Sequence, residues 1–227
     1  KKKFKIRNYN NKHLLENYFY KIIKNLKDNG KALSMDEVIF IKKNKKKFPK
    51  KSFVITFDDG FENNYSVAAP ILDDLNIPAT FYFSTDFINN NTMSWIDKIE
   101  YCFELDKKIK SLEVNNFGKF DISSIEKKIK SLELIRSKVK SNFNINTEKL
   151  VKEIFKQFNI KMINNSNNDI DKKIDWQKTK LLNNNKLFTL GGHSHLHMPL
   201  TYFSKKSADE QVAKSIKLFK KNTNIVL

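Results

Sequence analysis

Two short apolar segments that enclose an amphipathic stretch constrain the fold of this chain more than any other feature. Ser52–Phe57 and Ala79–Ser84 are rich in phenylalanine and β-branched residues, as expected of strands. Residues 63–75 between them have helical spacing, and Pro70 predicts a kink or restart there. Strand, helix and strand in this order predict a βαβ unit with parallel strands. The unbroken apolar character of Ser52–Phe57 indicates a strand buried on both faces.

The remaining patterns complete an α/β order of elements within one domain. Helices are expected near residues 13–29, 34–43, 95–105, 123–141, 147–158, 175–184 and 204–221, a hairpin near 112–122, and strands at 187–192 and 224–227. We expect a single domain over residues 1–227, made of a helical lead-in (1–51), the βαβ unit (52–84), a largely helical insertion (85–185) and a final part that contains a histidine cluster (186–227).

The net charge of +18 raises the question of nucleic-acid binding. Almost all of this charge is lysine, however, and the only arginines are Arg7 and Arg136. Proteins that read nucleic acids depend on arginine for bidentate contacts, so we expect no specific nucleic-acid binding.

Location and membrane insertion are predicted from what the sequence does not contain. No apolar run approaches the roughly 18 residues that a transmembrane helix needs. No secretory signal is visible, and Cys102, the one cysteine, rules out an intrachain disulfide. These features favour a cytoplasmic protein, and they leave the oligomeric state open.

The pair Asp58-Asp59, followed by Gly60, comes directly after the first predicted strand. The carboxyl ends of parallel strands are where α/β folds place their sites. Neighbouring residues of a strand point to opposite faces, so the two carboxylates are expected to have different tasks, and Gly60 permits the chain to turn. Alternatively, the two acids cap the following helix or belong to a polar loop.

Three of the four histidines fall within five positions, at the end of a predicted strand. His193 and His197 are four residues apart, between Gly191-Gly192 and Pro199, which favours a loop. Their imidazoles can converge on one metal ion, and His195 is then expected to point elsewhere. Two histidines and one carboxylate leave a coordination position open, as in catalytic zinc sites, and a spare carboxylate beside activated water is suited to amide or ester hydrolysis.

These motifs together resemble the polysaccharide deacetylases of carbohydrate esterase family four, also called the NodB homology domain. The resemblance rests on Thr56-Phe-Asp-Asp-Gly60, Ala79-Thr-Phe-Tyr-Phe83 and the segment His193-Ser-x-x-His197-Met-Pro-Leu200. It implies a distorted (β/α) barrel and removal of acetyl groups from sugars.

The resemblance also implies a role for each matched residue. Asp58 would be the general base, and Asp59, His193 and His197 would hold Zn²⁺ or, alternatively, Co²⁺, Ni²⁺ or Mn²⁺. Ser194 and Gly60 would support the two loops. The family's later motifs, including a histidine that acts as general acid, have no counterpart after His197. We therefore expect a C-terminally truncated barrel, with the general acid beyond the end of the chain.

The resulting functional prediction is a metal-dependent hydrolase that removes acetyl groups from an N-acetylated sugar of a bacterial cell-surface polysaccharide or its precursor. An acetylated oligosaccharide or polysaccharide is the expected partner. Two alternatives stay open: a non-catalytic, metal-containing glycan-binding module, and a lysine-rich nucleic-acid-binding protein.

Overall fold

The computed structural model describes residues 4–105, 108–142, 144–165 and 168–225, and the chain divides into two compact units. The first, which we call the sheet unit, contains Leu14–Thr92 and the chain from Asn165 onward. The second, which we call the helical unit, contains Met93–Asn164 and the N-terminal residues up to His13.

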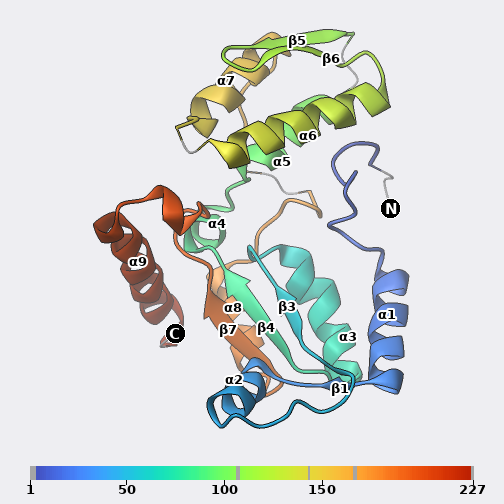
Figure 1. The fold of residues 1–227 in the computed structure, drawn as a ribbon, viewed down its shortest axis with the longest axis vertical. Helices are drawn as coiled ribbons and strands as arrows, with labels where there is room; N and C mark the ends of the chain where they lie inside the picture. The colour runs from blue at the N-terminus through green and yellow to red at the C-terminus, as the bar shows by residue number, and fades with distance from the viewer. Residues whose placement is uncertain (1–3, 106–107, 143, 166–167, 226–227) are drawn as a thin grey trace. The chain divides into compact units, whose positions relative to one another are not determined.

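A parallel sheet forms the centre of the sheet unit (Figure 1). Among the described residues, its strands lie in the order β3 (Ile55–Phe57), β4 (Ala79–Phe83) and β7 (Phe188–Gly192). In register, Phe57 lies opposite Phe81, and Phe81 opposite Leu190. The predicted βαβ unit is therefore confirmed, and the carboxyl ends of all three strands meet at one edge of the sheet.

The segment predicted as one buried strand, Ser52–Phe57, is instead divided. Its first part, β2 (Ser52–Phe53), pairs with β1 (Lys31–Ala32), whereas β3 pairs with β4. Val54 at the break is 38% exposed. The prediction of burial on both faces is wrong because β3 is an edge strand of the described sheet, so neighbours cover it incompletely.

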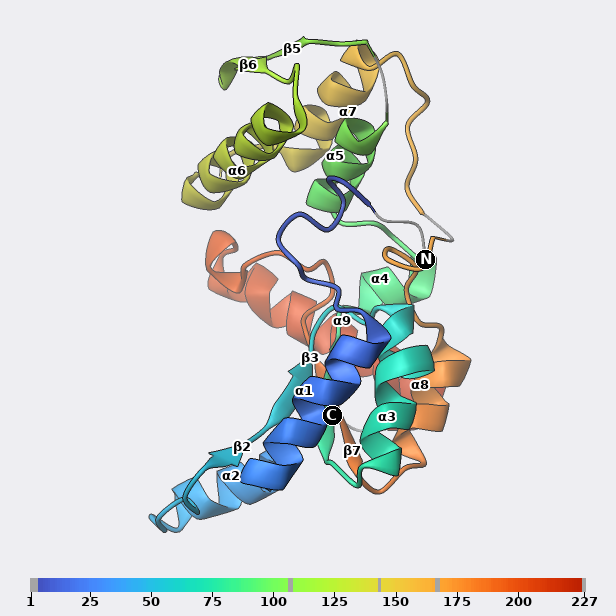
Figure 2. The same ribbon diagram turned by 90° about the vertical axis from the view of Figure 1, so that its right-hand side faces the viewer.

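Helices surround the sheet. They are α1 (Glu16–Asn29), α2 (Met35–Lys43), the π-helical turn η1 (Asn64–Ala68), α3 (Ala69–Asp74), α4 (Thr85–Asn90), α8 (Trp176–Asn183), the short η2 (Leu200–Tyr202) and α9 (Lys205–Thr223). The helices α2, α8 and α9 of this unit begin at residues whose side chains cap them. Ser34 caps α2 in a capping box with Glu37, and Pro70 stands in the first turn of α3, which confirms the predicted restart. Figure 2 shows α1 and α3 beside the sheet from a second side.

Aromatic side chains form the centre of the core of the sheet unit. The ring of Phe81 stacks on Phe57 at 5.0 Å and meets the edge of Phe188 at 5.3 Å. Phe83 of the same strand contacts Phe219 of α9 at 5.9 Å. This packing joins all three strands to a helix and fixes the edge of the sheet at which the aspartates and histidines follow.

The described residues of the helical unit form a hairpin and three helices. These elements are α5 (Trp95–Glu104), β5 (Ser111–Val114), β6 (Gly118–Asp121), α6 (Ile125–Ser141) and α7 (Thr147–Gln157). The predicted hairpin is confirmed, since β5 and β6 pair antiparallel. The predicted insertion, 85–185, extends beyond this unit at both ends because α4 and α8 belong to the sheet unit. The single-domain organisation itself stays a prediction.

The mixed α/β class is confirmed, whereas the described strands form open sheets and no closed barrel. Asn224 and Ile225 are not in a strand, and residues 226–227 of the last predicted strand lie outside the described residues. No helix in the described part of the chain is both long and apolar enough to cross a membrane.

A carboxyl group is buried in the helical unit. Glu100 of α5 is 1% exposed, and its carboxylate lies 3.9 Å from the ammonium group of Lys12, which also pairs with Asp97. Burial, reinforced by the charge of Asp97, raises the pKa of Glu100 to about 7, although Lys12 opposes the shift.

Glu100→Gln is expected to change how the stability of the chain depends on pH. Because the pKa of Glu100 is raised in the folded state from 4.5 to about 7, its contribution to stability is complete below pH 4.5 and is lost as pH rises through 7. The free energy of unfolding, measured with urea at pH 5 and pH 8, should rise in the variant relative to the wild type by about 3 kcal/mol between the lower and the higher pH. Glu133→Gln, at an exposed position of α6, is the control; a Glu100→Gln difference that does not vary with pH would contradict this account.

Candidate metal centre

A sharp turn after β3 presents the two aspartates. Asp59 and Gly60 both have left-handed backbone angles, with φ of +71° and +75°, and the amide of Gly60 donates to the carbonyl oxygen of Asp58 at 2.9 Å. Asp58 is exposed, whereas Asp59 is half-buried and directed toward the histidines. The turn therefore gives the two carboxylates different surroundings, as the sequence predicts.

Gly60 fits this turn because a side chain has no room there. A Cβ atom at this position would lie 2.8 Å from Phe83 Cδ1 and 2.9 Å from Ile88 Cγ2. The carbonyl oxygen of Gly60 accepts from the amide of Ile174 at 2.9 Å, which ties the turn to a neighbouring segment. The space around Gly60 therefore favours glycine at this position, and its supporting role at the site stays a prediction.

The histidine loop, residues 193–197, is attached through its main chain to the start of α4. The hydroxyl of Ser84 donates to the carbonyl oxygen of His193 at 2.8 Å. The amide of Thr85 donates to the carbonyl oxygen of Ser194 at 3.2 Å, and that of Asp86 to the carbonyl oxygen of His195 at 3.0 Å. Ser194 therefore contributes through its backbone, with a left-handed φ of +62°.

His195 points away from the ligands, as predicted. Its side chain is buried, and its Nδ1 lies 2.9 Å from the hydroxyl of Thr85. Burial lowers the pKa of His195, and the charge of Lys214 acts in the same direction, so the neutral ring is favoured. His195 is thus a structural part of the loop.

Asp59, His193 and His197 converge. The carboxylate Oδ1 of Asp59 lies 2.8 Å from Nε2 of His197 and 3.5 Å from Nε2 of His193. One ligand atom from each residue falls within 4.8 Å of the others. Two imidazole nitrogens and one carboxylate oxygen are the ligand types of catalytic zinc sites, so these residues fit a divalent cation.

The carboxyl group of Asp59 is held in its ionised form. Burial raises its pKa, but the hydrogen bond and charge of His197, with the charges of Lys173 and His193, outweigh burial and place the pKa below its ordinary value. An ionised carboxylate at this point is what a cation ligand requires.

The residues that hold this cluster in place were not predicted from the sequence. Hydrogen bonds connect Ser84 and Thr85 to the histidine loop. The ring of Phe87 packs against that of His197, with ring centres 4.8 Å apart. Ser84 and Thr85 follow the second predicted strand directly, which is the one signal that could have found them.

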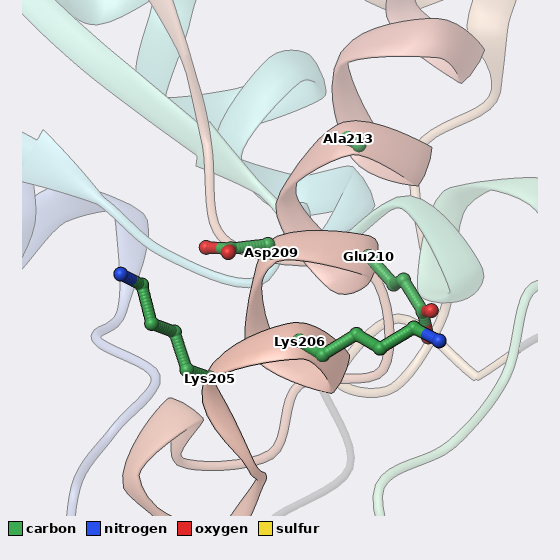
Figure 3. Close-up of a pocket in the computed structure, with 5 residues that line it drawn as sticks. All are labelled: Lys205, Lys206, Asp209, Glu210 and Ala213. Carbon is green, nitrogen blue, oxygen red and sulfur yellow. The ribbon is translucent and has the colours of Figure 1, made fainter.

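A shallow hollow of about 650 Å³ lies along the first turns of α9 (Figure 3). Its lining is formed by Lys205, Lys206, Asp209, Glu210 and Ala213. Figure 3 shows these charged side chains extending outward from the helix, and no residue of the Asp59 cluster lines the hollow. Its chemistry is that of a solvated helix surface, so the cluster is the stronger candidate.

Gly60→Ala is expected to lower the free energy of unfolding by about 3 kcal/mol. The added Cβ atom would collide with Phe83 and Ile88, and alanine disfavours the left-handed backbone at this position. Gly118→Ala is the matched control, since Gly118 also has positive φ but no atom within 4 Å of an added Cβ. Thermal unfolding should show the smaller loss, about 1 kcal/mol, for the control. Equal losses in the two variants would contradict the packing argument.

Known proteins share sequence with part of this chain. Poly-beta-1,6-N-acetyl-D-glucosamine N-deacetylases from Staphylococcus aureus strains are 38% identical over 95 residues, which is 41% of this chain and 31% of theirs. The match thus spans about a third of the length of these curated relatives.

Solved structures show the same fold. The deacetylase domain of BpsB from Bordetella bronchiseptica aligns over 95% of this chain and 66% of its own, with 13% identity and a TM-score of 0.50. The Streptococcus pyogenes deacetylase PplD, solved with acetate, aligns over 92% and 58%, with 15% identity and a TM-score of 0.51. The family model for polysaccharide deacetylases matches residues 45–225, which include both aspartates and the histidine loop. The chain belongs to the polysaccharide deacetylase family.

Proposed function

We propose that this chain hydrolyses the acetamide bond of N-acetylglucosamine units in a polysaccharide, which releases acetate and leaves a free amine. Family membership supports the reaction class, and the names of the Staphylococcus aureus relatives support a β-1,6-linked polymer as the substrate. The convergence of Asp59, His193 and His197 carries the proposal, because it supplies the ligand set that this chemistry requires.

These three residues would hold the ion, with Zn²⁺ favoured by the nitrogen-rich ligand set and Co²⁺, Ni²⁺ or Mn²⁺ as alternatives. When bound, such an ion supplies Lewis-acid activation of water and of the amide carbonyl. The protein keeps Asp59 ionised through its contact with His197 and orients the histidine loop through Ser84 and Thr85.

Asp58 is the proposed general base. Asp59 is engaged with His197, whereas Asp58 is exposed at the preceding position of the same turn. A carboxylate there can accept a proton from the attacking water. Gly60 and Ser194 take no part in this transfer and maintain the two loops.

For the fold, we propose that the three-stranded sheet is part of the distorted (β/α) barrel expected for the family. The alignments to solved deacetylases over more than nine tenths of this chain support this proposal. The cytoplasmic location and the lack of specific nucleic-acid binding stay predictions.

The test is acetate release from a soluble β-1,6-linked N-acetylglucosamine oligomer by the zinc-loaded chain. Asp58→Asn should lower kcat by at least about 100-fold, because a general base is lost, while zinc binding is retained. Asp209→Asn, in the hollow on α9, is the matched control and should leave turnover unchanged.

Two outcomes would contradict the proposal. Undiminished turnover in Asp58→Asn would remove Asp58 as the base. Binding of the oligomer by the wild type without any acetate release would support a glycan-binding module instead of an enzyme.

A further inference from the structure

A buried lysine lies behind the candidate metal centre. Lys173 belongs to the sheet unit and lies three residues before α8 begins at Trp176. It is only 3% exposed. Burial of an ammonium group is costly unless its surroundings compensate, so a lysine in such a place indicates a specific task.

Two aromatic faces surround this ammonium group. Its Nζ lies 3.2 Å from the centre of the Phe61 ring and 4.8 Å from the centre of the Phe87 ring. Phe87 is 4% exposed, so its contact with the ammonium group is shielded from water. A cation–π contact is stronger when it is desolvated, which makes Lys173 an effective anchor for both rings.

The backbone around Lys173 is tied to the turn that presents Asp59. Lys173 forms a β-bridge with Phe61. On either side of this bridge, the amide of Ile174 donates to the carbonyl oxygen of Gly60, and the amide of Glu62 donates to the carbonyl oxygen of Lys172, both at 2.9 Å. The amide of Lys173 itself donates to Oδ1 of Asn91 at 2.8 Å, just after α4. One residue thus joins the aspartate turn to the helix that holds the histidine loop.

The contacts continue from this lysine to a metal ligand. The ring of Phe87 that faces Lys173 also packs against His197, with ring centres 4.8 Å apart and planes tilted by 44°. His197 in turn contacts Asp59 at 2.8 Å.

We propose that Lys173 is a positioning residue for the metal centre, which holds Phe61 and Phe87 so that Asp59 and His197 keep the geometry of a ligand pair. This inference rests on the proposed function, since it assigns a role at the same site. Lys173 is 3% exposed and packs on the two rings, so its proposed role is exercised through the ligands.

The direction in which the affinity for a cation changes when Lys173 is replaced separates this positioning role from a simple effect of its charge. Removal of a nearby positive charge would by itself tighten the binding of a cation. Loss of ligand positioning would instead weaken cation binding, by about 10- to 100-fold when the lost residue orients a ligand without itself binding the metal. We expect weakening.

The experiment measures zinc affinity of the full chain by competition with a chromophoric chelator, for wild type and Lys173→Met. Lys178→Met is the matched control, because the ammonium group of Lys178 pairs with Glu62 at 2.7 Å and lies 6.0 Å from the centre of the Tyr65 ring. Lys173→Met should weaken zinc binding about tenfold or more, while the control stays close to wild type. The absorption spectrum of the cobalt-loaded chain should shift in Lys173→Met alone, because the ligand field reports the positions of the ligands.

Phe87→Leu provides a second test that keeps the lysine, and near-ultraviolet circular dichroism checks that each variant is folded. If the ring transmits the effect, Lys173→Met should add little further loss in the Phe87→Leu background. Tightened or unchanged zinc affinity in folded Lys173→Met, or full additivity of the two substitutions, would overturn the inference. Absence of zinc binding in the wild type would instead overturn the proposed function, and this inference with it.

Discussion

The parallel register of β3, β4 and β7 is the constraint on which the candidate site depends. It places the carboxyl ends of β3 and β7 at one edge of the sheet, so that Asp59 meets two histidines more than a hundred residues away in the sequence. The contacts of Phe81 with Phe57, which stacks on it, and with Phe188, which it meets edge to face, hold this register, because a shift of one residue would turn the rings to the opposite face. The metal ligands are thus fixed by the aromatic core beneath them.

Two loops at this edge are held by different means. The aspartate turn depends on two consecutive left-handed residues, Asp59 and Gly60, and on main-chain bonds to the segment around Lys173. The histidine loop is held by Ser84 and Thr85 at the end of β4, the central strand. Because β4 lies between β3 and β7, it supports both loops and limits their relative movement.

Much of this site could be predicted from local patterns. The Asp-Asp-Gly turn and the two histidines were found because each stands directly after an apolar segment, and most helix ends agree within a few residues because Ser34, Ser94 and Asp175 cap them. The division of residues 52–57 into two strands was missed, since the choice of pairing partner is a tertiary effect. Lys173 was also missed: it stands in a lysine- and asparagine-rich stretch, and its aromatic partners are far away in the sequence.

The most direct test of the account is the metal content of the purified chain, measured by mass spectrometry for the wild type and for His193→Ala/His197→Ala. We expect about one divalent ion per wild-type chain, because the site has a single set of ligands, and loss of that ion in the double variant. No ion in the wild type after incubation with zinc, or equal content in the two proteins, would contradict the claim that Asp59, His193 and His197 form a metal centre.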